Sequence, residues 1–152
     1  MRELLQKFYG AFKKRDAETM ASCYHQDITF NDPAFGKLYG IDAGDMWRML
    51  CGNATDLDIT YEILQADEEK GLVQWKADYT FNKTGRKVHN VVLAKIRFKD
   101  GLIIEHTDSF NLHTWAKQAM GFQGWLLGNT PFFRQKLRAT TNGMLKKFQS
   151  KK

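Results

Sequence analysis

The sequence contains little cysteine, and its two cysteines, Cys23 and Cys51, form no Cys-x-x-C pair. Both fall within predicted helices, so we interpret them as reduced, packed thiols rather than as a disulfide. Histidine is also scarce, with four in 152 residues. A metal site needs three or four converging ligands. We therefore expect neither a metal site nor a cofactor.

Long apolar runs are missing as well. No stretch approaches the ~20 apolar residues that cross a bilayer, and the first residues lack the apolar region of a secretory signal. Internal repeats and low-complexity linkers are also absent, and 152 residues are the size of one ordinary domain. We expect a cytoplasmic protein with one domain and no membrane contact.

The formal net charge of +6 is unevenly distributed. Residues 134–152 hold seven of the 23 Lys and Arg residues and no acid, which leaves residues 1–133 with a charge of about −1. We interpret residues 134–152 as a basic, helical C-terminal extension with a solvated face, outside a domain of residues 1–133. Removing residues 146–152 should then leave the fold nearly intact. Binding of this tail to RNA or to an acidic partner is the less favoured interpretation, because it contains no recognisable nucleic-acid motif.

The hydrophobic periodicity changes along the chain. Apolar residues at helical spacing predict helices over residues 2–14, 17–24, 43–51 and 112–120. Alternating residues predict strands over 28–30, 57–63, 73–81, 88–98 and 102–110. Residues 122–133 are aromatic and contain glycine, and we expect a packed excursion there. This order indicates an α+β fold, in which a curved, mostly antiparallel sheet wraps the N-terminal helices and leaves a cone for a ligand.

The predicted strand 102–110 carries the strongest candidate site. Because side chains alternate along a strand, His106, Asp108 and Phe110 share its apolar face, while Ile103 lies on the other face. An imidazole beside a carboxylate in apolar surroundings is suited to proton transfer. The alternative is structural: Asp108 caps a turn, and His106 is a core histidine bonded to a carbonyl or to Tyr79.

A second carboxylate and several amphipathic side chains complete the candidate pocket. Asp32 ends a short strand just before Pro33, where an aspartate also commonly forms an Asx turn. The predicted pocket-lining residues, which could equally belong to the plain core, are Tyr24, Trp47, Trp75, Tyr79, Asn90 and Phe110.

Several motifs occur together in a familiar order. They are the Gln6–Phe12 segment, Asp16, the Asp27–Pro33 segment, Gly36 and Gly40, the Met46–Leu50 segment, and the Ile104–Asp108 segment. In order and spacing, from about residue 4 to 120, they resemble the SnoaL-like branch of the nuclear-transport-factor-2-like superfamily. The resemblance implies a cone-shaped α+β barrel, usually homodimeric through the outer face of its sheet.

The resemblance also narrows the chemistry. Asp108 matches the acid/base aspartate of SnoaL-like cyclases, and Asp32 matches the catalytic base of ketosteroid isomerases. The oxyanion-hole residues of those isomerases correspond to Phe8 and Ala94, which supply no donor. Epoxide hydrolases of this fold need an Asp-Arg-Asp arrangement, and no arginine lies beside Asp108 on its strand face.

These observations lead to one principal hypothesis. The protein is a cofactor-independent isomerase, cyclase or hydrolase that acts on a small apolar carbonyl compound. Asp108 is its general acid/base, His106 tunes or shares the proton, and Asp32 orients the substrate or acts as a second carboxylate. The alternatives are a noncatalytic ligand-binding module and a protein-interaction module. Apolar side chains at Ile103, Val91 and Leu93 predict a homodimer through the sheet.

Overall fold

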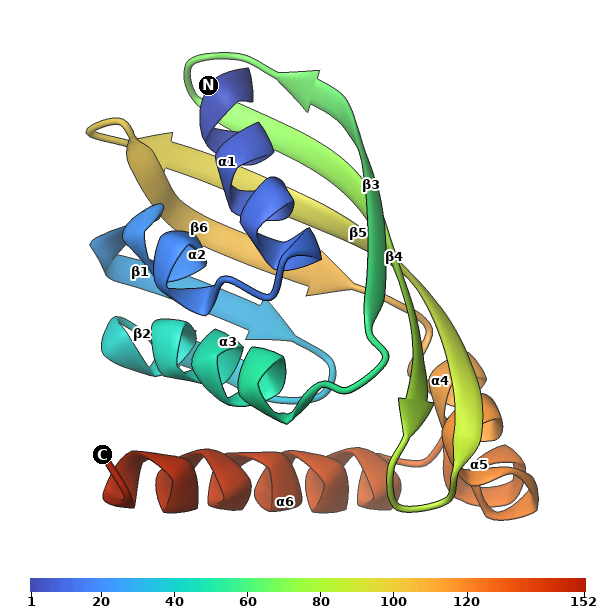
Figure 1. Ribbon diagram of the computed structural model, residues 1–152. Coiled ribbons are helices and arrows are strands. Elements are labelled where there is room, and N and C mark those ends of the chain that lie inside the picture. Colours follow the sequence, from blue (N-terminus) through green and yellow to red (C-terminus); the bar gives the residue numbers. More distant parts are fainter.

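The computed structural model describes residues 1–152, which form a curved sheet with helices on its concave side and a long helix across one end (Figure 1). The helices are α1 (Arg2–Lys13), α2 (Ala17–Ser22), α3 (Ile41–Asn53), α4 (Leu112–Met120), α5 (Phe122–Leu127) and α6 (Pro131–Ser150). The strands are β1 (Tyr24–Asp32), β2 (Gly36–Tyr39), β3 (Asp58–Ala66), β4 (Lys70–Phe81), β5 (Arg86–Lys99) and β6 (Leu102–Ser109). The predicted α+β class, with its mostly antiparallel sheet and N-terminal helices, is confirmed.

The sheet order is β2-β1-β6-β5-β4-β3, and only β1 and β6 run parallel. Their register pairs Phe30 with His106 and Asn31 with Thr107. The C-terminal ends of the two strands therefore lie side by side, and Asp32 and Asp108 follow at these ends. This pairing, between segments about 75 residues apart in the chain, creates the candidate site.

The second predicted helix is shorter than expected. Residues 17–24 were predicted as helix, but α2 ends at Ser22 and Tyr24 is the first residue of β1. The parallel ladder explains the difference, because Tyr24 pairs with Ile103 and the amide of Ile103 donates to the carbonyl of Cys23. A tertiary pairing therefore overrides the local helical pattern.

The prediction that Ile103 lies on the face of the sheet opposite His106 is wrong. The register between β5 and β6 shifts between Arg97 and Phe98, so that Ile104 has no partner opposite it. This β-bulge puts Ile103 on the same side of the sheet as His106, and Ile103 is completely buried in the core. On the outer face Val91 is 42% exposed. The homodimer stays a prediction.

The segment after α4 packs on one side only. Gly124 is buried against α4, where a Cβ would collide with the Ala116 carbonyl oxygen. Phe122 and Trp125, on the same short helix, are 72% and 57% exposed. Residues 122–133 are therefore a packed excursion on the glycine side of α5 and an exposed aromatic surface on the other.

The C-terminal helix α6 is not solvated on all sides. Leu145 is buried, and Phe148 packs against the main core. Gln149 and Lys152 bond to the carboxylate of Asp45 on α3, which is itself buried. These contacts remove the basis for expecting the last residues to be dispensable. No helix of the protein combines the length and the apolar character that crossing a membrane requires.

Candidate functional site

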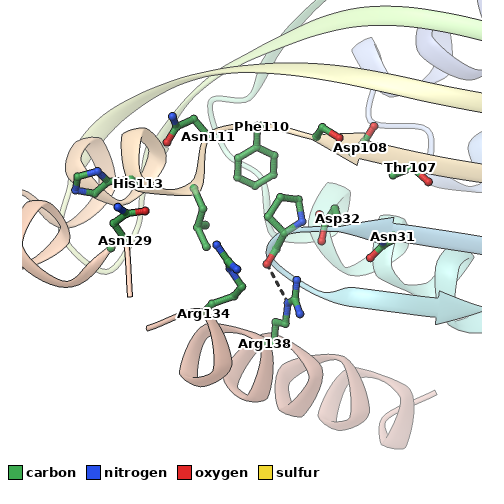
Figure 2. Close-up of a pocket in the computed structure, with 14 residues that line it drawn as sticks. Asn31, Asp32, Thr107, Asp108, Phe110, Asn111, His113, Asn129, Arg134 and Arg138 are labelled. Carbon is green, nitrogen blue, oxygen red and sulfur yellow. Dashed lines mark hydrogen bonds between the residues drawn. The ribbon is translucent and has the colours of Figure 1, made fainter. Parts of the chain in front are cut away.

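Two cavities meet at the C-terminal ends of β1 and β6. The first, the apolar cavity, has a volume of about 390 Å³ and lies between α3, the sheet and α6; its walls include Phe12, Met46, Trp47, Trp75, Tyr79 and Met144. The second, the polar cavity, has a volume of about 410 Å³, and its walls include Asn31, Thr107, Asn111, Asn129, Arg134 and Arg138 (Figure 2). Asp32, Asp108 and Phe110 line both. The two carboxylates therefore stand where an apolar and a polar compartment join.

Asp108 is the end of a chain of buried hydrogen bonds. The indole Nε1 of Trp47 donates to the Tyr24 hydroxyl over 2.8 Å, and that hydroxyl lies 2.8 Å from Nδ1 of His106. Nε2 of His106 lies 2.9 Å from Oδ1 of Asp108. The same oxygen accepts a 3.3 Å bond from the indole of Trp75. His106 and Asp108 are 0% and 3% exposed, so water does not compete for these bonds.

This series of hydrogen bonds determines the tautomer of His106. An indole N–H only donates, so the Tyr24 oxygen accepts from Trp47 and its own proton must go elsewhere. Burial raises the pKa of Tyr24 well above its ordinary value, so the hydroxyl keeps that proton. The available acceptor is Nδ1 of His106. His106 therefore carries its proton on Nε2 and donates it to Oδ1 of Asp108.

The other oxygen of Asp108 remains accessible. No hydrogen bond engages Oδ2. This atom is not fully buried, because the Tyr9 hydroxyl is the only fully buried side-chain polar atom that lacks a partner. Since Asp108 lines both cavities, Oδ2 is the atom that a bound molecule can reach. Oδ1 of Asp108 is therefore held by His106 and Trp75, while Oδ2 has no protein partner.

Asp32 has a different environment. Its Oδ1 accepts a 2.6 Å bond from the amide of Phe35, three residues along the chain, so the side chain stabilises its own turn, as is common for aspartate at such a position. Burial raises the pKa of the Asp32 carboxyl to about 7, against the opposing effect of the Phe35 bond, and the negative charge of Asp108 raises it further. At neutral pH this carboxyl is therefore present in both protonated and ionised forms, so it can donate or accept a proton.

Most of the predicted lining residues border the apolar cavity, but two predicted site residues do not. Trp47, Trp75, Tyr79, Asn90 and Phe110 line it. Tyr24 and His106 line neither cavity and form a buried layer behind Asp108. His106 contacts Asp108 and borders neither cavity, and its predicted role of tuning or sharing the proton of Asp108 stays a prediction.

The expected alternative partner of His106 is also wrong. Tyr79 accepts a 2.8 Å bond from the indole of Trp115 and does not reach the histidine. The partner of His106 is Tyr24, which sequence reasoning placed in a helix. No group of three or more His, Cys, Asp or Glu side chains is arranged to hold a metal ion.

Sequence reasoning missed the contribution of α6. Arg134 and Arg138 line the polar cavity, and Thr140, Thr141 and Met144 line the apolar one. No arginine lies beside Asp108 on the face of its own strand, whereas α6 brings two from the C-terminal end of the chain. The excess of basic residues in this helix was the available signal, but it was interpreted as a solvated surface.

Comparison with solved structures shows the same fold in proteins of low sequence identity. A proposed polyketide cyclase from Silicibacter sp. TM1040 aligns with a TM-score of 0.67 at 16% identity over 78% of this chain and 93% of its own. An LEH-like epoxide hydrolase from M. tuberculosis aligns with a TM-score of 0.59 at 18% identity over 83% and 89%. TerC, co-crystallised with polyporic acid, aligns with a TM-score of 0.64 at 17% identity over 77% and 95%.

These identities establish a shared fold and nothing finer. Comparison with curated protein sequences finds no match. A sequence model of the SnoaL-like domain matches residues 5–106, about two thirds of the chain, which includes α1 through most of β6 and ends at His106. The chain therefore belongs to the SnoaL-like family.

Proposed function

We propose that this protein is an enzyme that moves a proton on a small, mostly apolar carbonyl compound, as isomerases and cyclases do. The observation that carries the proposal is the placement of Asp108. One of its oxygens is fixed by His106 and Trp75, and the other is free at the border of the apolar cavity. A carboxylate restrained in this way retains its geometry during proton transfer, which is a requirement for a general base.

The roles of the two carboxylates follow from their surroundings. Asp108 removes a proton from the carbon next to the carbonyl, and the Nε2–H of His106 supports its charge before the transfer. Asp32, with a pKa of about 7, supplies a proton to the developing oxyanion or receives it on the return step. Pairs of carboxyl groups with different environments commonly divide acid and base work in this manner.

Three further observations support a small organic substrate. The apolar cavity has a volume typical of pockets that take drug-sized molecules, about 300–1,000 Å³. Its walls are mainly aromatic and aliphatic, which favours an apolar body. TerC, a protein of the same fold, was co-crystallised with polyporic acid.

The proposal can be tested before the natural substrate is known. The measurement is hydrogen–deuterium exchange at the α-carbon of 2-tetralone, cyclohexanone and 1-indanone in D₂O, followed by proton NMR. We expect the wild-type protein to accelerate exchange of at least one ketone by about 100-fold or more over Asp108→Asn, the range of general base catalysis. Asp58→Asn, which removes an exposed carboxylate of β3, is the matched control and should retain the wild-type rate.

Binding is measured separately, from the shift of the Trp75 indole signal. Trp75 bonds to Asp108 and lines the apolar cavity, so a ketone in the cavity should move this signal in both the wild type and Asp108→Asn. A ketone that binds but exchanges equally slowly with both proteins would contradict the enzymatic proposal. The protein would then be a noncatalytic binding module.

A further inference from the structure

We propose that the polar cavity is a subsite for a carboxylate group of the substrate, held by Arg134 and Arg138 of α6. This inference rests on the proposed function, since it concerns the same bound molecule. The apolar body would occupy the apolar cavity, the carboxylate would lie in the polar cavity, and the reacting carbon between them would face Asp32 and Asp108, which line both. The substrate class is thus an apolar carbonyl compound that is also a carboxylic acid.

The two arginines have unused hydrogen-bonding capacity. Arg138 donates one bond, from Nε to the carbonyl oxygen of Pro33 over 3.2 Å, and its remaining N–H groups have no protein partner. Arg134 makes no side-chain hydrogen bond. Neither forms an ion pair with an aspartate or glutamate. A planar guanidinium with free donors matches a carboxylate in two-point geometry.

The helix that carries these arginines is fixed to the turn that carries Asp32. Three successive carbonyl groups of that turn, those of Pro33, Ala34 and Phe35, accept bonds from Arg138, Thr141 and Asn142 over 3.2, 2.9 and 2.9 Å. The helix that carries both arginines therefore has a defined position relative to Asp32, and the Arg138 side chain is also held directly. Figure 2 shows both projecting from α6 toward Asp32 and Phe110. Little rearrangement is needed to receive an anion, which favours binding.

The electrostatic surroundings also favour an anion. Residues 109–152 contain eight lysines and arginines and no acid. The other polar side chains of the cavity wall include Asn31, Asn111 and Asn129, which are uncharged. Of the two carboxyl groups at the border, Asp32 is partly protonated near neutral pH because burial raises its pKa to about 7. The positive charge of the two arginines is therefore only partly offset within the cavity.

The test uses two probes that differ only in the proposed group. 1-Naphthylacetate carries a carboxylate, and 2-(1-naphthyl)ethanol has the same skeleton with a neutral hydroxymethyl group. Their dissociation constants are measured on the full-length protein from the shifts of the Trp47 and Trp75 indole signals, since both residues line the apolar cavity. We expect the wild type to bind the acid about tenfold or more tightly than the alcohol, as for hydrogen bonds to charged groups.

Three variants assign this preference to the arginines. Arg134→Gln with Arg138→Gln should bind the two probes equally. Because the Arg138 side chain also holds the Asp32 turn, Arg134→Gln alone is the second variant and should lose part of the preference with no structural cost. Lys146→Gln with Lys147→Gln removes the same charge from an exposed part of α6 and should keep the full preference.

The outcomes separate this inference from the proposed function. Equal binding of both probes by the wild type, or a preference that survives the double arginine variant, would overturn the carboxylate subsite alone. Failure of both probes to move either indole signal would instead overturn the ligand-binding cavity, and the subsite with it. A preference lost equally in the lysine variant would mean that general positive charge, rather than these arginines, attracts the acid, and would also overturn the proposal.

Discussion

The indole of Trp47, on α3, donates a 2.8 Å hydrogen bond to the hydroxyl of Tyr24, which lies 23 residues earlier in the chain, on β1. This bond occupies the Tyr24 oxygen as an acceptor and directs its proton to His106. Through it, a residue at the cavity wall determines how the imidazole presents itself to Asp108. The first two predictions concern this series of hydrogen bonds.

The first prediction is the tautomer of His106. We expect Nδ1 of its ring to accept a hydrogen bond and Nε2 to carry the proton, because the Tyr24 hydroxyl must donate to Nδ1. Long-range proton–nitrogen correlation spectra of uniformly ¹⁵N-labelled protein distinguish the two ring nitrogens. His25→Gln, His89→Gln and His113→Gln assign the remaining histidine signals. A proton found on Nδ1 would mean that the Tyr24 hydroxyl is not the donor.

The second prediction compares two buried tyrosines. Tyr24→Phe removes a hydroxyl that has two partners, so Trp47 and His106 are each left with a buried unpaired nitrogen, and we expect about 2–5 kcal/mol less unfolding free energy. Tyr9→Phe removes a buried hydroxyl that has no partner, so it should be neutral or stabilise the fold by about 1 kcal/mol. Urea unfolding of both variants measures the difference. Equal losses would show that Tyr9 has a hydrogen-bond partner in solution.

The third prediction is a pH dependence caused by Asp32. Its carboxyl titrates at an ordinary pKa of 3.8 when unfolded and at about 7 when folded, because burial disfavours the charge. Between these values the folded state binds the proton more tightly, so the contribution of Asp32 to stability falls as pH rises from about 4 to about 7 and is constant above that range.

The matched variant for this effect is Asp32→Asn, which keeps an acceptor for the Phe35 amide. We expect the unfolding free energy of the variant to gain on the wild type as pH rises, by an amount on the order of 1–4 kcal/mol at pH 8. Urea unfolding of both proteins at pH 4.5, 6 and 8 measures it. A difference that does not change with pH would show that the Asp32 carboxyl is as well solvated in the fold as in the unfolded chain.

The fourth prediction concerns the end of α6. The buried carboxylate of Asp45 accepts bonds from Arg48, Gln149 and Lys152, over 3.0, 3.0 and 2.6 Å. Burial by itself would raise the pKa of Asp45, but the bonds from Lys152, Gln149 and Arg48 outweigh it and hold the pKa below its ordinary value. Deleting residues 146–152 removes two of these partners and also Phe148. We expect about 2–4 kcal/mol less unfolding free energy.

The control for the deletion is Lys146→Gln with Lys147→Gln, which changes charge but none of these contacts. Thermal unfolding should show a clear loss of melting temperature for the deletion and almost none for the control. If the deletion melts at the wild-type temperature, the bonds to Asp45 contribute no net stability, and the tail is the solvated extension that its composition predicts.

Local patterns were sufficient to predict the class of fold and one half of the candidate site. Side chains two residues apart on a strand share a face, so the proximity of His106 and Asp108 was predictable from the sequence. Nε2 of His106 lies 2.9 Å from Oδ1 of Asp108. The turn at Asp32 was predictable for a similar reason, since Pro33 and the short Asp side chain act within the turn itself. These features depend on neighbours in the chain.

The features that only the tertiary structure decided all depend on contacts between distant segments. The parallel pairing of β1 with β6 brings Asp32 to Asp108 and makes Tyr24, rather than Tyr79, the partner of His106. One unpaired residue, Ile104, turns Ile103 into the core, and no local periodicity reports such a bulge. The packing of α6 over the Asp32 turn places Arg134 and Arg138 in the polar cavity. The sequence determines which side chains share a face within an element, whereas register and helix docking, which are set by packing across the whole core, determine which elements share a site.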